Sequence, residues 1–301
     1  MTFNNILSKK NQNLHLVAKR ESNNYQNGIP FPSIVIDDFF DEIFLDKIVK
    51  EFPDLSKMNS SQQYKNKNEI KFANNKLECF PESIKNLFKF LNSEYFLDFL
   101  QKLTSIKEKL KIDSELNGGG LHEIKKGGVL KIHTDFNKHP TLNLDRRLNV
   151  LVYLNKKWNS EYGGDLEFWD KNLKQCKKRI SPNFNKIVIF STNDYSYHGH
   201  PDPVNCPGDV SRKSLALYYF SKGRPSTEIN FTKVKNKTYF DDRFGFKNET
   251  ENENRSLKNY FRRFKIYKLM KKFEKKYLRK KKINKKNSFL HYKANFKGSF
   301  V

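Results

Sequence analysis

The chain has 301 residues, a formal net charge of +25 and an apolar fraction of 37% that includes 27 Phe and 14 Tyr. This length can bury a full core, three widely spaced cysteines exclude a disulfide framework and a zinc knuckle, and no apolar run approaches the roughly 20 residues of a membrane-spanning helix. Residues 1–20 also lack the apolar stretch of a signal peptide, so we expect a cytoplasmic protein.

The N-terminal region begins without a clear pattern and then becomes ordered. Residues 1–28 are polar and Asn-rich, which is typical of a flexible, loosely held arm. Ser33–Phe40 starts as a β-branched strand. Asp41 then caps a predicted helix that continues to Phe52 with apolar residues at helical spacing.

Helices are also expected in the next part of the chain. Residues 58–75 are polar and indicate a loop. Residues 81–110 contain two amphipathic stripes and predict two or three helices whose apolar sides belong to the core. We therefore expect residues 29–117 to form a helical support for the part that follows.

The pattern changes at Gly118 from helical spacing to short apolar runs broken by turn residues. Six runs have the composition of strands: Leu121–Ile124, Val129–His133, Leu148–Leu154, Asp165–Trp169, Ile187–Phe190 and Ser214–Phe220. Short strands without a long helical pattern between them favour an antiparallel sandwich or barrel. The predicted fold class is mainly β with α additions, and the β-rich core is placed at residues 118–230.

Most of the net positive charge lies in residues 231–301, which hold 23 Lys and Arg against 6 Asp and Glu. We expect Tyr239–Glu253 to be a linker and residues 257–282 to form a basic amphipathic helix. Such a helix could lie on an anionic membrane, follow a nucleic-acid backbone or pack its apolar side on the core. A lysine-rich composition without any polyanionic partner explains the same charge.

The strongest chemical signal is Gly127–Asp135, a short strand pattern that ends in a histidine and an aspartate. Successive side chains on a strand point to opposite faces, so His133 and Asp135 project from one face. A second histidine at the same point would complete the two-histidine, one-carboxylate set that holds non-haem Fe(II) and leaves positions open for substrate. His198 is a candidate for this partner, and His200, two residues later, is the alternative.

A second signal lies on the last predicted strand, where Arg212, Ser214 and Ala216 alternate onto one face. An inward-facing arginine needs an anion, because a buried guanidinium without a partner is unfavourable. A carboxylate co-substrate would supply that anion and form a bidentate pair with the guanidinium.

These motifs carry a resemblance to a known family. His133-Thr-Asp135, then His198, then Arg212-Lys-Ser214 look like the motifs of the Fe(II)/2-oxoglutarate-dependent dioxygenases, particularly the prolyl 4-hydroxylase-like branch.

Two further segments support the resemblance. Arg146–Asn155 ends in Tyr-Leu-Asn, and Gly163–Trp169 begins with Gly-Gly-Asp-Leu, and both are similar to strands of that branch. The resemblance covers about Pro30 to Glu228 and implies a dioxygenase domain at residues 29–230. It implies a double-stranded β-helix, or jelly roll, with N-terminal helices packed against one sheet.

The resemblance also implies roles for individual residues. His133, Asp135 and His198 would be the iron ligands. Arg212 would anchor the distal carboxylate of 2-oxoglutarate, and Tyr153 would give that carboxylate a second hydrogen bond.

Two neighbouring positions are less defined by the resemblance. Ser214 would be a further contact to the co-substrate. On the strand before the His-x-Asp motif the branch often has a tyrosine, whereas this chain has Ile124 with His122 two residues earlier. Which residue of that strand contacts the co-substrate is left open.

The implied activity is hydroxylation of an unactivated C–H bond with Fe(II), 2-oxoglutarate and O₂, releasing succinate and CO₂, with ascorbate as an optional reductant. The substrate stays open among small molecules, lipids, glycans and proteins, a prolyl residue included. Nucleic-acid demethylases of this superfamily carry a second arginine where this chain has Tyr218. The alternative from another class is a non-enzymatic jelly-roll binding module whose basic tail docks to nucleic acid or an anionic membrane.

Overall fold

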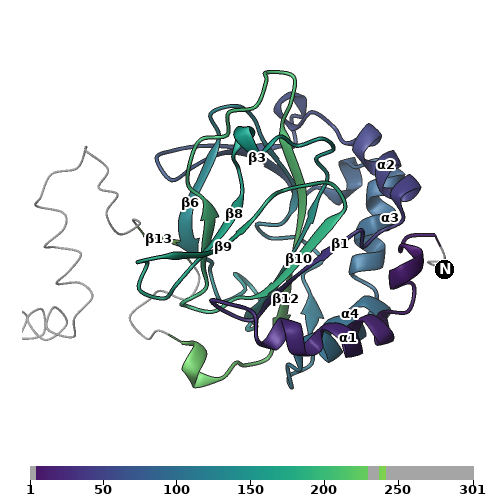
Figure 1. The fold of residues 1–301 in the computed structure, drawn as a ribbon, viewed down its shortest axis with the longest axis vertical. Coiled ribbons are helices and arrows are strands. Elements are labelled where there is room, and N and C mark those ends of the chain that lie inside the picture. Colours follow the sequence, from purple (N-terminus) through teal and green to yellow (C-terminus); the bar gives the residue numbers. More distant parts are fainter. Residues whose placement is uncertain (1–4, 230–236, 242–301) are drawn as a thin grey trace, which may run out of the picture. The chain divides into compact units, whose positions relative to one another are not determined.

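The computed structural model describes residues 5–229 and 237–241, all within one compact unit, Met1–Lys247 (Figure 1). The helices in these residues are α1 (Leu14–Gln26), α2 (Glu42–Glu51), α3 (Glu82–Leu91) and α4 (Glu94–Thr104). The strands are β1 (Ser33–Asp37), β2 (Gln62–Lys65), β3 (Glu69–Asn74), β4 (Lys111–Ile112), β5 (Gly120–Ile124), β6 (Val129–Thr134), β7 (Asp145–Tyr153), β8 (Leu166–Trp169), β9 (Cys176–Ile180), β10 (Lys186–Ser191), β11 (Tyr197–His200), β12 (Arg212–Ser221) and β13 (Tyr239–Phe240).

The described strands join in one antiparallel sheet that curls back on itself. Its first half has the order β1-β10-β7-β12-β5, and its second half continues as β3-β6-β11-β8-β9. The predicted jelly roll, mainly β with added helices, is confirmed. The basic helix predicted at residues 257–282 lies outside the described residues.

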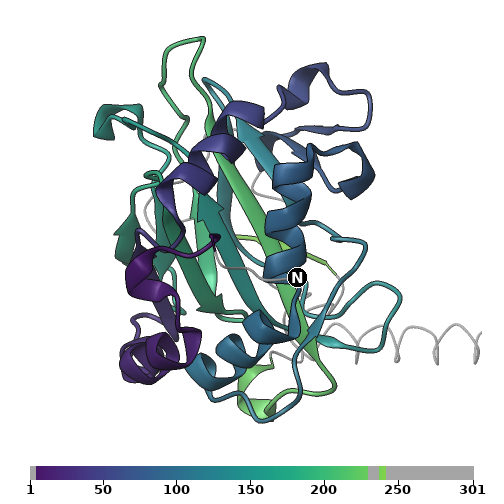
Figure 2. The same cartoon turned by 90° about the vertical axis from the view of Figure 1, so that its right-hand side faces the viewer.

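The helices cover the outer face of the first half of the sheet, as Figure 2 shows with the helices in front. Strand β7 illustrates the reason. Val150 and Val152 are fully buried in the same apolar cluster as the helices, whereas Asn149 and Tyr153 line the cavity inside the curled sheet. Alternation along the strand therefore separates a helix-facing core from a polar interior.

A β-bulge reverses this alternation at the start of β7. Tyr219 of β12 pairs with Leu148, but Phe220 pairs with Arg146, so Arg147 is an extra residue on β7. An inserted residue changes the face to which the preceding side chains point. Arg146 therefore lines the interior cavity, while Arg147 binds Glu108 beyond the end of α4, with 2.7 Å between Nη1 and Oε2.

The prediction of a flexible arm over residues 1–28 is wrong for the described part. The Asn13 side chain caps α1 by accepting hydrogen bonds from the backbone N–H groups of His15 and Leu16. Leu14 and Val17 of α1 are fully buried. The helix is ordered because this narrow apolar side packs on α4 and β1.

The prediction of a loop over residues 58–75 is also wrong. Strands β2 and β3 form a hairpin there, and the Asn66 side chain holds its turn by accepting from the N–H groups of Asn68 and Glu69. The hairpin is polar because one side of β3 faces the interior cavity, to which it contributes Glu69 and Lys71. Tertiary pairing of β3 with β5 and β6 outweighs its weak strand composition.

Other differences concern short elements. Strands β9 and β11 extend the second half of the sheet and have no clear apolar alternation in the sequence. Residues 239–240, expected to begin a linker, form β13 and pair with β6. The predicted cap at Asp41 is confirmed by the 2.9 Å hydrogen bond from the Phe44 N–H. None of the helices in the described ranges is long and apolar enough to span a membrane.

Candidate active site

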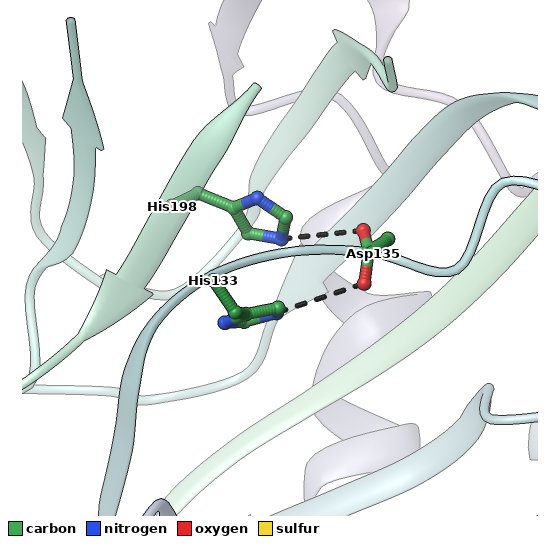
Figure 3. A group of neighbouring side chains, drawn as sticks. All are labelled: His133, Asp135 and His198. Atoms are coloured by element: carbon green, nitrogen blue, oxygen red, sulfur yellow. Dashed lines mark ion pairs between the residues drawn. The ribbon is translucent and has the colours of Figure 1, made fainter. Parts of the chain in front are cut away.

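His133, Asp135 and His198 converge at one point inside the curled sheet (Figure 3). His133 on β6 and His198 on β11 are direct cross-strand partners, and Asp135 follows the last residue of β6. The nearest carboxylate oxygens of Asp135 lie 3.6 Å from Nε2 of His133 and 3.4 Å from Nε2 of His198. One ligand atom from each residue lies within 4.8 Å of the other two.

Backbone carbonyl groups determine the tautomer of both imidazoles. Nδ1 of His133 lies 2.8 Å from the Lys131 carbonyl oxygen, and Nδ1 of His198 lies 2.9 Å from the Ser196 carbonyl oxygen. A carbonyl oxygen only accepts, so each Nδ1 carries the proton and each Nε2 presents a lone pair to the shared point. Burial, partly offset by Asp135, lowers the pKa of His198 to about 4, which keeps this ring neutral at pH 7.

A buried cation supports the carboxylate. Arg146, which is 1% exposed, places Nη2 3.1 Å from Oδ2 of Asp135, and the Asn149 amide donates to the same oxygen at 2.9 Å. Burial would raise the pKa of Asp135, but Arg146 and the neighbouring histidines hold it well below its usual range. Asp135 is therefore an anion, as a metal ligand must be.

Aromatic rings hold the guanidinium of Arg146 in turn. Its central carbon lies 3.3 Å from the ring centroid of Tyr218 and 4.6 Å from that of Phe136. Nε and Nη2 also donate to the Asn149 side-chain oxygen at 3.0 and 2.6 Å. Cation–π contacts and this two-point hydrogen bond restrict the guanidinium to one orientation.

The donor set fits iron. Two neutral imidazoles and one carboxylate on the same side of a site form the facial triad typical of non-haem Fe(II), with positions left for other ligands. His198 belongs to this group, whereas the alternative ligand His200 lies further along β11 and faces the cavity.

Arg212 lies in the same cavity, which has a volume of about 260 Å³. It is 4% exposed, donates from Nε to the Gly164 carbonyl oxygen at 2.7 Å and from Nη2 to the Tyr153 hydroxyl at 3.1 Å. These two contacts orient the guanidinium group, but both acceptors are neutral and do not balance its positive charge. The cavity volume is close to the lower end of the roughly 300–1,000 Å³ of small-ligand pockets.

Strand register places the remaining predicted contacts in one row. Ser214 on β12 pairs with Tyr153 on β7 and with His122 on β5. Directly paired residues face the same side of a sheet, and all three line the cavity. Ile124 pairs with Arg212 and lines it too. The contact that the sequence left open therefore has His122 as its polar candidate.

The cavity contains polar atoms that the described residues do not satisfy. Nε2 of His122 and both ring nitrogens of His200 are buried without a hydrogen-bond partner among those residues. Burial lowers the pKa of His122 to about 3 and that of His200 well below its usual value, so both rings are neutral at pH 7. Unsatisfied buried polar atoms are unfavourable, and a polar ligand or water in the cavity would satisfy them.

Two other buried polar side chains, His139 and Glu167, lie outside this site. Nε2 of His139 lies 3.4 Å from Oδ1 of Asp113, and the His139 ring packs on Phe220. His139 therefore has a structural role in the loop before β7. Glu167 accepts from the Trp169 indole and pairs with Arg179. None of these six residues lines the cavity.

Other residues of the site were missed in the sequence. Arg146 belonged to the motif that ends in Tyr-Leu-Asn, but the bulge that turns it inward has no sequence signature. Phe240 and Lys71 also line the cavity, and both come from segments that the sequence indicated to be a linker and a loop.

A jelly roll with a two-histidine, one-aspartate centre and an inward-facing arginine is the architecture of a non-haem iron oxygenase. Comparison with known proteins gives the same class. Residues 119–220 match the family model of the 2OG-Fe(II) oxygenase superfamily. A stretch of 88 residues is 30% identical to prolyl 3-hydroxylase OGFOD1 of Mus musculus and covers 27% of this chain but 16% of that protein. The chain thus matches about a sixth of the length of this curated relative.

Solved structures show the same fold. A prolyl hydroxylase from Trichoplax adhaerens, solved in complex with a hypoxia inducible factor peptide fragment, has a TM-score of 0.51 at 16% identity over 71% of this chain and 93% of its own. A Pseudomonas putida prolyl-4-hydroxylase has a TM-score of 0.50 at 13% identity over 68% of this chain and 100% of its own. Residues 119–220 thus match the 2OG-Fe(II) oxygenase superfamily, and the fold of the chain is similar to that of prolyl hydroxylases.

Proposed function

We propose that the protein is an Fe(II)- and 2-oxoglutarate-dependent dioxygenase that hydroxylates an unactivated C–H bond and releases succinate and CO₂. The observation that carries the proposal is the shared cavity. It holds three converging ligand atoms with correctly protonated histidines, and it also holds a buried arginine whose charge the described residues leave available.

Each part of the cavity has a role in this reaction. His133, Asp135 and His198 would hold the iron, and bound iron would supply the chemistry that couples oxidative decarboxylation of 2-oxoglutarate to hydroxylation of the substrate. Arg212 and the Tyr153 hydroxyl would bind the distal carboxylate and so orient the keto acid toward the metal.

For the substrate, we propose to test a prolyl residue of a polypeptide first. The support is the segment shared with a prolyl 3-hydroxylase and the similar fold of two prolyl hydroxylases. Proline-containing peptides should raise succinate formation above the rate without substrate and gain one oxygen atom in a mass spectrum. If free amino acids, glycans or lipids stimulate turnover and peptides do not, the prolyl assignment is wrong while the dioxygenase assignment stands.

The dioxygenase itself is tested by ordered anaerobic additions to the wild-type protein. Fe(II) followed by 2-oxoglutarate should produce the visible charge-transfer band of the iron–keto acid chelate, and O₂ should then yield succinate. His133→Ala should abolish both signals. Arg212→Gln should keep metal binding but require far more 2-oxoglutarate, because the carboxylate loses its cation.

His15→Ala is the matched control, since this histidine side chain is 53% exposed on α1 and does not line the cavity. The control should behave as wild type. Absence of both the band and succinate from the wild-type protein would refute the dioxygenase.

A further inference from the structure

Strand β13 covers part of the edge of β6, the strand that carries His133. The first half of this edge is paired with β3, through Glu69 opposite Leu130 and Ile70 opposite Val129. The second half is paired with residues 239–240, because Tyr239 lies opposite Thr134 and Phe240 lies opposite His133. The Asp241 N–H continues the ladder by donating to the Ile132 carbonyl oxygen at 3.0 Å.

Phe240 lies against the imidazole of His133. The two ring centroids are 5.3 Å apart with an angle of 40° between the planes, and Phe240 and Thr238 both line the cavity. Thr238 and Phe240 are two residues apart, so they share one side of the extended segment. The residues that adjoin the metal ligand on this side are therefore supplied by a part of the chain that follows the matched family segment, residues 119–220.

We propose that residues 238–241 are a cover segment for the metal centre, with Phe240 as a positioning and specificity-determining residue; the part of this inference that concerns turnover rests on the proposed function. The Phe240 ring keeps water from one side of His133 and limits the orientations of its imidazole, which the Lys131 carbonyl already holds through Nδ1. Exclusion of water favours reaction with substrate over unproductive consumption of 2-oxoglutarate.

The cover segment also limits how a substrate can approach. An extended peptide can bind a protein by adding a strand to a free sheet edge. Beside His133 that edge is already paired with Tyr239 and Phe240. A substrate therefore enters the cavity with a side chain or as a narrow molecule, and it does not pair with β6 at this position.

The first test measures metal retention and needs no turnover. The full-length protein is loaded anaerobically with Fe(II), and transfer to a coloured chelator is followed. Phe240→Ala should release the metal roughly 3- to 10-fold faster, which corresponds to the loss of one aromatic contact. Phe240→Leu keeps an apolar cover and should stay within about twofold of wild type.

Ile70→Ala is the matched control. Ile70 of β3 is an apolar residue that pairs with the same edge of β6, but it lies opposite Val129 at the other end of that edge, is 40% exposed and does not line the cavity. It should release metal at the wild-type rate. Equal release rates for wild type, Phe240→Ala and Ile70→Ala would overturn the proposal.

The second test is amide hydrogen exchange on the wild-type protein, which does not depend on any variant folding. The Asp241 amide should exchange at least about tenfold more slowly than an unstructured amide, since it donates within the β6 ladder. Exchange at the unstructured rate would show that β13 is not formed in solution and would overturn the proposal.

In turnover assays, Phe240→Ala should form more succinate without substrate and less hydroxylated product per succinate. If the wild-type protein forms no succinate at all, the proposed function fails, yet metal release and exchange still decide whether the cover segment exists.

Discussion

Replacing Arg146 with methionine tests the electrostatics behind the metal centre. The substitution keeps an apolar side chain of similar length between the Tyr218 and Phe136 rings but removes the cation that lies 3.1 Å from Asp135. The carboxylate side chain is only 11% exposed, so its charge would be left buried with far less compensation. Removing one member of a buried ion pair typically lowers the free energy of unfolding by about 3–5 kcal/mol.

The loss should depend on pH in a defined direction. In the wild-type protein the pKa of Asp135 is held well below its usual value, so the ionised carboxylate stabilises the fold near neutral pH. This contribution to stability is lost only as the pH falls through the lowered pKa of the folded state. Without Arg146, burial is opposed mainly by the neighbouring histidines, and we expect it to raise the pKa of Asp135 above the unfolded value. The folded variant then binds a proton that the unfolded chain does not, and its stability increases as pH falls toward about 4.

Urea unfolding of the metal-free proteins in the presence of a chelator measures both effects. We expect a difference of about 3–5 kcal/mol between wild type and Arg146→Met at pH 7, which narrows as the pH is lowered toward 4. Lys10→Met is the control, because both side chains of the Lys10–Asp38 pair are more than half exposed and such pairs contribute less than about 1 kcal/mol. A pH-independent difference, or one below about 1 kcal/mol, would refute the role assigned to Arg146.

Three further predictions follow from other contacts. Asn149→Ala removes the 2.9 Å hydrogen bond to Asp135 and should weaken Fe(II) affinity roughly 10- to 100-fold in a competition titration, with unchanged affinity arguing against this support. Gly199→Ala would place a Cβ 2.6 Å from the Leu130 carbonyl oxygen. This clash should separate β11 from β6 and lower the affinity for Fe(II), and a variant that binds Fe(II) as wild type does would contradict this strand pairing. Leu14→Ala should lower the free energy of unfolding by about 2–5 kcal/mol, because Leu14 is fully buried. Leu16→Ala is the control, and because Leu16 is 61% exposed it should change this free energy by less than about 0.5 kcal/mol. Equal effects of the two substitutions would show that α1 does not pack as described.

Much of the fold was readable because the β-rich core follows simple alternation. Val150 and Val152 point to the helices and Tyr153 to the interior, as the pattern of β7 predicts. The proximity of His133 and His198 could be expected only from the family resemblance, because cross-strand register between distant segments leaves no local signal. The direction of Arg146 depends on the bulge at Arg147, which hydrophobic periodicity does not encode.

The misassigned segments share a physical cause. Helix α1 has few apolar residues because only a narrow side of it contacts α4, and the hairpin of β2 and β3 is polar because it faces solvent and the cavity. The amino-acid composition of a segment reflects the average environment of its residues, so a prediction based on composition fails for an element that a few tertiary contacts stabilise. The cytoplasmic location and an anionic partner for residues 257–282 stay predictions.

Because His133 and His198 pair across β6 and β11, a bound metal ion would also stabilise the association of these two strands. The helices share a buried cluster with strands of the first half of the sheet, and the described residues of β6, β8, β9 and β11 do not belong to that cluster. An ion bound by both histidines would fasten β6 to β11, as a cross-link does, on the side that lacks this helical layer. We therefore expect the metal-free protein to open first between these two strands, and bound metal to protect their backbone amides more than those of β7 or β10.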